Sequence, residues 1–121
     1  MANFKSAILM TGSATTASGQ DVELIAPIDV QNEDRISFQF YNPNGTAGHI
    51  DTIKVYGRLA ATSGTLGAAA EWTQIGDDVV VSGSSSALKS ISTTGLMWVG
   101  ATISGTTTFS AGHTYALLRQ A

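Results

Sequence analysis

The sequence predicts an all-β protein, an antiparallel β-sandwich or jelly roll of about seven to nine short strands. Two observations lead to this prediction. Segments that alternate between apolar and polar residues recur at spacings of roughly 8 to 14 residues, with Gly, Pro, Asn or Asp between them. The periodicity of an amphipathic helix, by contrast, is missing from the sequence.

The clearest strand signals lie on either side of a predicted turn. Residues 36–41 and 52–59 alternate with the period of half-buried strands. The sequence between them, at 42–45, is Asn-Pro-Asn-Gly, which favours a turn because Pro presets φ and Asn and Gly tolerate positive φ. We therefore expect a hairpin, with Gly57 marking a bulge or a crowded contact on its inward row. That row is expected to contain Ile53, Val55 and Leu59.

Further strands are predicted on both sides of this hairpin. Pro27 indicates a kink or an edge position in its strand. In residues 96–103, Met97 shares one row with Val99, Ala101 and Ile103, and Trp98 lies on the other row. The strand at 87–92 carries Leu88 and Ile91 as its apolar residues. The full set of further strands is 4–10, 22–30, 72–75, 79–82, 87–92, 96–103 and 114–119.

The connections between these strands are expected to be loops. Residues 11–20 form a polar loop, and Gly76-Asp77-Asp78 forms a turn. Residues 60–72 contain Gly64 and Gly67 followed by three consecutive Ala, so we expect a long loop with room for one helical turn at its end.

Length and composition bound the function classes. The 121 residues, 43% of them hydrophobic, fit a single domain over 1–121, with residues 1–5 as an extended N-terminal arm. The net charge is −3 and the six Lys and Arg residues are scattered, which argues against nucleic-acid binding. Without Cys, neither disulfides nor Cys-ligated zinc can form. No segment resembles a signal peptide or a membrane span, so we expect synthesis and folding in a cytosol.

Candidate catalytic and metal sites are weak. His49 and Asp51 would share a strand face, but no nucleophile elbow accompanies them, and a solvated His beside a Gly-rich turn is the simpler interpretation. The acidic clusters at 32–34 and 77–78 lack the spacing of a calcium loop, and His113 has no second ligand nearby. Asn44-Gly45-Thr46 matches a glycosylation pattern that the turn already explains. We expect no enzyme activity, no metal and no cofactor.

The aromatic residues leave two interpretations open. Trp72, Trp98, Tyr41 and Tyr56 could form a platform on which sugar rings stack, as in a carbohydrate-binding module. The favoured interpretation places Trp72 and Trp98 in the core or at a subunit interface.

The scarcity of charge is the strongest functional signal. Charged residues make up 12% of the chain, about half the usual share, whereas Ser and Thr together number 28 and Gly 13. Three long blocks, at 6–20, 59–70 and 90–118, contain no Asp, Glu, Lys or Arg. Because interface cores are depleted in charge in the same way, we expect these surfaces to pack against protein neighbours, including copies of the chain itself.

The order of five segments carries a family resemblance. They are RISFQFYNPNGTA, IDTIKVYGRL, EWTQIGDDVVV, LKSIS and GLMWVGATISGTTT, over about residues 34–108. In this order the chain resembles small β-sandwich modules of tailed-bacteriophage virions, most closely capsid decoration (cement) proteins. In those proteins a strand of the type I-x-V-Y-G precedes a W-x-x-I-G turn and a late strand rich in Val and Gly.

This resemblance implies a non-enzymatic virion protein on the outer capsid surface. It implies homo-oligomers, with trimers favoured, that bind the major capsid protein and neither nucleic acid nor membrane. The alternatives are a carbohydrate-binding module, free or on a phage tail or fibre, and an unrelated bacterial assembly or surface domain. The residues expected at the interfaces are Ala2, Asn3 and Phe4 in the N-terminal arm, Leu66 in the 60–70 loop, and Trp98 for oligomerisation.

Overall fold

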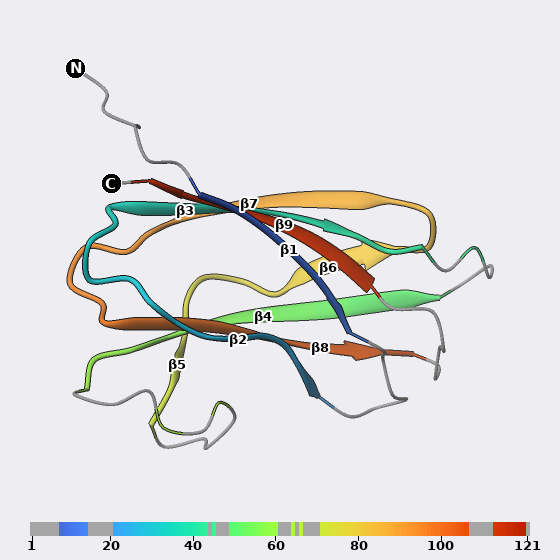
Figure 1. Ribbon diagram of the computed structural model, residues 1–121. Helices are drawn as coiled ribbons and strands as arrows, with labels where there is room; N and C mark the ends of the chain where they lie inside the picture. The colour runs from blue at the N-terminus through green and yellow to red at the C-terminus, as the bar shows by residue number, and fades with distance from the viewer. Residues whose placement is uncertain are drawn as a thin grey trace.

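A computed structural model describes residues 8–14, 21–43, 45, 49–60, 64, 66, 71–106 and 113–120. These residues form nine strands and no helix, in two antiparallel sheets that lie one above the other (Figure 1). The predicted all-β fold class and strand number are confirmed. The strands are β1 Ile8–Ala14, β2 Val22–Asp29, β3 Arg35–Tyr41, β4 Ile50–Arg58, β5 Thr73–Gln74, β6 Val79–Ser82, β7 Ser86–Ser92, β8 Trp98–Gly105 and β9 His113–Gln120.

The strand order is that of a jelly roll. One sheet has the order β1-β9-β3-β7 and the other the order β2-β8-β4-β5. Strand β6 also pairs with β4, on the same edge as β5 and opposite to β8. The strand pairs are nested along the chain, as in a long ribbon folded back between β4 and β5: β1 pairs with β9, β2 with β8, β3 with β7, and β4 with β5 and β6. Rolling this ribbon brings β9 against β3 and β8 against β4.

The predicted hairpin between residues 36–41 and 52–59 is wrong. Both segments are strands, β3 and β4, but they lie in different sheets. Each is a central strand whose two edges are already paired, β3 with β7 and β9, and β4 with β8 and β5/β6. The turn-like sequence that begins at Asn42 therefore belongs to a crossing between the sheets.

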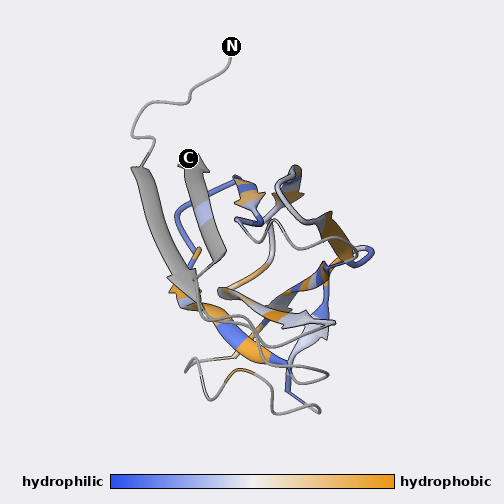
Figure 2. Cartoon of the chain, turned by 90° about the vertical axis from the view of Figure 1, so that its right-hand side faces the viewer, coloured by the Kyte–Doolittle hydropathy of each residue, from blue (hydrophilic) through white to orange (hydrophobic). Residues whose placement is uncertain are grey.

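The core lies between the sheets and follows the strand alternation. In β4, buried Ile53 and Val55 alternate with half-exposed residues, and the change of hydropathy along the strands is visible in Figure 2. The predicted rows of β8 are confirmed for the residues from Val99 to Ile103, with Trp98 half-buried on the other row. The main core side chains are Leu24, Ile25, Ile28, Val30, Ile36, Phe38, Phe40, Ile53, Val55, Val81, Ile91, Val99, Ala101 and Ile103.

Leu59 does not lie where the alternation suggested, and of the two apolar residues named for 87–92 only Ile91 is buried. Leu59 follows the end of β4 and is 72% exposed, and Leu88 is 78% exposed because the inward row of β7 contains Ile91 instead. Gly57 makes the predicted crowded contact, since a Cβ there would lie 2.8 Å from Cδ1 of Ile75. The register of β4 with β8 continues past Gly57, so there is no bulge at this position.

Several segment boundaries also differ from the prediction. Residues 11–14, expected in a loop, continue β1 and pair with β9. Pro27 lies in an edge strand, as predicted, and the β2–β8 register shifts between Ile25 and Ile28. The described residues of 60–72 are not helical, and the others, like the proposed arm at 1–5, lie outside the described part of the chain.

Candidate functional site

The pair that the sequence offered as a catalytic candidate is enclosed. Asp51 lies on the inward row of β4, and its Oδ1 atom is 2.7 Å from Nε2 of His49. Both side chains are 0% exposed, so the expectation of a solvated His49 is wrong. A hydrogen-bonded pair with no exposed surface offers no path for a substrate. We interpret it as a structural contact that closes this end of the core.

Asn42 anchors the crossing at the same end of the molecule. Its Nδ2 group donates to the Val81 carbonyl oxygen at 3.0 Å, and its backbone N–H donates to the Ser85 carbonyl oxygen at 3.0 Å. Its own carbonyl oxygen accepts from the Ser84 N–H at 2.9 Å. Asn42 is fully buried, so these bonds tie the crossing to the β6–β7 turn where water cannot compete.

A second cluster surrounds Arg58 on the outer face of the β2-β8-β4-β5 sheet. The guanidinium lies 5.9 Å from the centre of the Trp72 ring, and Nη2 lies 3.2 Å from Oε1 of Glu71. Gly64, at φ +63°, packs so closely that a Cβ there would clash with Nη1 of Arg58. The Arg58 side chain is 10% exposed, and its Nε and Nη1 atoms have no hydrogen-bond partner in the described part of the chain.

The predicted interface residues in this region make contacts within the chain. The Trp98 indole N–H donates to the Ala60 carbonyl oxygen at 3.2 Å. Leu66 covers Gly100, where a Cβ would lie 3.1 Å from Cδ2 of Leu66. Together with Arg58, these contacts hold the described residues that follow β4 over the sheet. A role of Leu66 and Trp98 between subunits stays a prediction, and Ala2, Asn3 and Phe4 lie outside the described residues.

Sequence spacing could not reveal the Arg58 cluster. Arg58, Gly64 and Glu71 have no regular separation, and only the return of the chain over the sheet brings them together. An open cavity adjoins the cluster, and its charged lining groups, Arg58 and Glu71, are already paired with each other. The rest of its lining consists of Gly57, Leu59, Thr73, Ile75 and Leu96.

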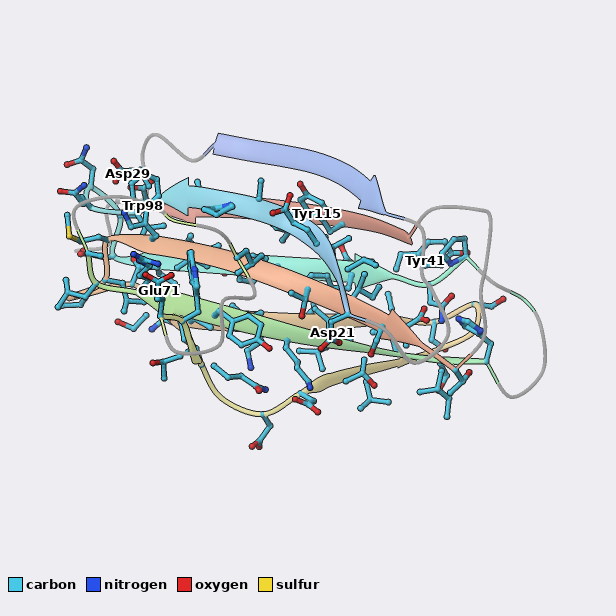
Figure 3. All side chains as sticks on the ribbon, turned by 90° about the horizontal axis from the view of Figure 1, so that it is seen from below. Asp21, Asp29, Tyr41, Glu71, Trp98 and Tyr115 are labelled. Carbon is cyan, nitrogen blue, oxygen red and sulfur yellow. The ribbon has the colours of Figure 1, made fainter. Side chains whose placement is uncertain are left out.

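Of the four aromatic residues considered for a sugar-binding platform, Trp72 is buried, and Trp98 and Tyr41 do not lie together. Trp72 is 6% exposed and one face of its ring is covered by Arg58, which confirms its placement inside the fold. Trp98 and Tyr41 belong to different sheets and lie at opposite ends of the molecule (Figure 3). No flat aromatic surface therefore joins them.

The outer side of β3 and β7 has a different character. We call it the β3–β7 face and define it by four register pairs, eight residues in all. Arg35 is the one charged residue among the eight. Nη1 of Arg35 donates to Oγ of Ser90 at 3.0 Å, and that hydroxyl lies 3.2 Å from Oγ of Ser37. Leu88 and Tyr41 are 78% and 44% exposed. The pairs are Arg35–Ser92, Ser37–Ser90, Gln39–Leu88 and Tyr41–Ser86.

Sites of other kinds were sought in the same residues. Across the described ranges, no three His, Asp or Glu side chains gather as they would around a metal ion. In those ranges there is also no helix long and apolar enough to cross a membrane.

Comparisons with known proteins give a likeness in fold. No protein-family model and no curated protein matches the chain. A solved structure of Bacillus endospore appendages, described as disulfide-linked pili, aligns with a TM-score of 0.53 and 14% identity over 94% of this chain and 86% of that one. A structure of infectious bursal disease virus, Gt strain, aligns with a TM-score of 0.45 and 11% identity over 96% of this chain and 32% of that one. The first match shows a shared fold alone, and the TM-score of the second is too low to establish one.

Proposed function

We propose that this chain is a non-enzymatic structural protein that works while packed against protein neighbours. The observation that carries the proposal is the β3–β7 face, with one charged side chain among eight positions and Leu88 78% exposed. Covering exposed apolar surface is favourable, and charge-poor, hydroxyl-rich surface costs less to desolvate than charged surface. The composition points the same way, because charged residues are 12% of the chain.

More specifically, we propose a head decoration protein on the capsid of a tailed bacteriophage. The sequence resemblance over about residues 34–108 supports this role. The fold shared with an appendage structure supports an assembled role in general. The protein would be made in the host cytoplasm and would join the virion surface by binding the major capsid protein.

Stabilisation of the shell would follow from mass action. Each copy that binds the assembled shell, and not its separate subunits, adds binding free energy to the assembled state. Many modest contacts then act together over the lattice. For copies seated on the shell, the resemblance further implies trimers.

The test is co-sedimentation with empty shells that lack the protein. We expect Leu88→Glu to weaken binding roughly tenfold or more, because a carboxylate in the β3–β7 face would be desolvated on contact. Val80→Glu is the matched control, since Val80 is also an exposed apolar residue, at 58%, but lies on β6.

Three results would contradict the proposal. Wild-type protein could fail to bind shells, or the Leu88 and Val80 variants could bind equally well. The third is binding to glycans that is lost in Trp98→Ala, which would identify a carbohydrate-binding module instead.

A further inference from the structure

The edges of the two sheets differ in their capacity to accept another strand. An edge strand presents N–H and C=O groups that another chain can pair with, and proteins block this with Pro, bulges, short strands or inward charges. The edges here are β1 and β7 in one sheet, and β2 and β5 with β6 in the other.

Both edges of the β2-β8-β4-β5 sheet carry such features. β2 contains Pro27, and its register with β8 shifts twice, between Glu23 and Ile25 and between Ile25 and Ile28. On the other side, β5 has two residues and β6 has four, so no continuous edge is available.

The β7 edge is blocked by a charge. Lys89 lies on the inward row of β7, between Ala87 and Ile91. Its Nζ donates to the Asp77 carbonyl oxygen at 3.1 Å, so the side chain bridges towards the turn between β5 and β6. An inward-pointing charge on an edge strand opposes the addition of another strand.

The β1 edge has none of these features. All seven residues of β1 pair with β9 in unbroken register, and the sequence ILMTGSA contains neither Pro nor a charged residue. Among the described residues no strand pairs with its other edge, and Figure 3 shows β1 as the outermost strand of its sheet.

We propose that two copies of the chain pair antiparallel through β1, about a twofold axis at Thr11. This register uses all seven residues and joins the two four-stranded sheets into one continuous sheet. Each larger residue then lies opposite a smaller one: Ile8 opposite Ala14, Leu9 opposite Ser13 and Met10 opposite Gly12. The sequence of β1 is thus complementary to itself, which identifies a second copy as the partner.

Other registers of the same pairing are poorer. An axis at Met10 would pair only residues 8–12 and would place Met10 opposite Met10. A shift by a single residue would pair outward-facing residues of one copy with inward-facing residues of the other, so the outer faces of the two sheets would lie on opposite sides. The contact concerns free copies of the chain and goes beyond attachment to a shell. It makes dimers, where the family resemblance implies trimers.

Light scattering during size-exclusion chromatography tests the contact without any shell. We expect the wild-type chain to form dimers and Thr11→Lys to weaken dimerisation roughly tenfold, because two like charges would lie opposite each other at the axis. Thr11→Glu should behave in the same way, and an equimolar mixture of the two variants should recover the dimer. Leu88→Lys adds the same charge on β7 and should leave the dimer intact. Thr11 is in register with Ala116, which is in register with the exposed Gln39. We therefore expect the folded monomer to tolerate a charge at position 11.

A disulfide provides a second readout. The chain has no Cys, so Thr11→Cys introduces one thiol, and Cβ atoms of opposed residues lie about 4.5–5.5 Å apart, close enough to bridge after small adjustment. Oxidation should give a covalent dimer with Thr11→Cys and mainly monomer with Leu88→Cys. A wild-type monomer, a trimer, a dimer that survives Thr11→Lys, or equal cross-linking of the two Cys variants would each overturn the proposal. Shell binding is measured separately, so the two proposals can fail independently.

Discussion

At the scale of single residues, buried and half-buried polar side chains contribute to the stability of the sandwich. Tyr115 of β9 packs against the core cluster, and burial raises the pKa of its hydroxyl above the usual 10.0. His49 and Asp51 are hydrogen-bonded to each other at 2.7 Å and have no exposed side-chain surface. Removing either partner of such a pair would leave a buried group without that bond, so we assign the pair to stability.

The pH dependence of Tyr115 follows from the sign of its shift. Because the folded pKa is raised, the folded state holds the proton more tightly, and the contribution to stability is full below pH about 10 and lost as pH rises through the folded pKa. We expect Tyr115→Phe, which cannot ionise, to show a smaller alkaline loss of unfolding free energy in urea titrations. An equal loss in both proteins would contradict this, and Tyr41→Phe on the exposed face is the control.

At the scale of elements, local patterns identified strands but not their partners. Alternation located β3, β4 and β8 because each has one face in the core. The β3–β4 hairpin failed because jelly-roll pairing is set by contacts far apart in the chain, and Asn-Pro-Asn-Gly suits a crossing as well as a turn. Leu88 and Ile91 have opposite parity in β7, so alternation did not assign its faces; Leu88 is exposed and Lys89 lies on the inward row, which an edge strand tolerates.

The crossing between β3 and β4 depends on Asn42. We expect Asn42→Ala to lower the unfolding free energy by about 1–3 kcal/mol, because it removes the bond to the Val81 carbonyl oxygen inside the core. Asn32→Ala, an exposed Asn in the turn before β3, should change it by less than about 0.5 kcal/mol. Equal effects in urea unfolding would mean that Asn42 does not fix the crossing.

The site residues were predicted less well than the strands. Trp98 was correctly placed on the row that faces away from the core, but its bond to Ala60 could not be read from spacing. The Arg58 cluster depends on the path of the chain after β4, which no periodicity specifies. The low share of charged residues, in contrast, can be read without knowing which strands pair, and for that reason it was informative about the surface.

At the scale of the whole molecule, two regions that are poor in charge lie on the same sheet. The β3–β7 face and the β1 edge both lie on the β1-β9-β3-β7 sheet. One is assigned to a protein shell and the other to a second copy of the chain. In both cases a neighbouring protein, and not a layer of surface charge, is expected to cover the sheet.

Sedimentation velocity of the purified chain, alone and with increasing amounts of empty capsid shells, tests this claim most directly. We expect a discrete oligomer in free solution that moves onto the shells and saturates at a fixed number of copies per shell. A chain that sediments as a monomer at every concentration and leaves the shells bare would contradict it.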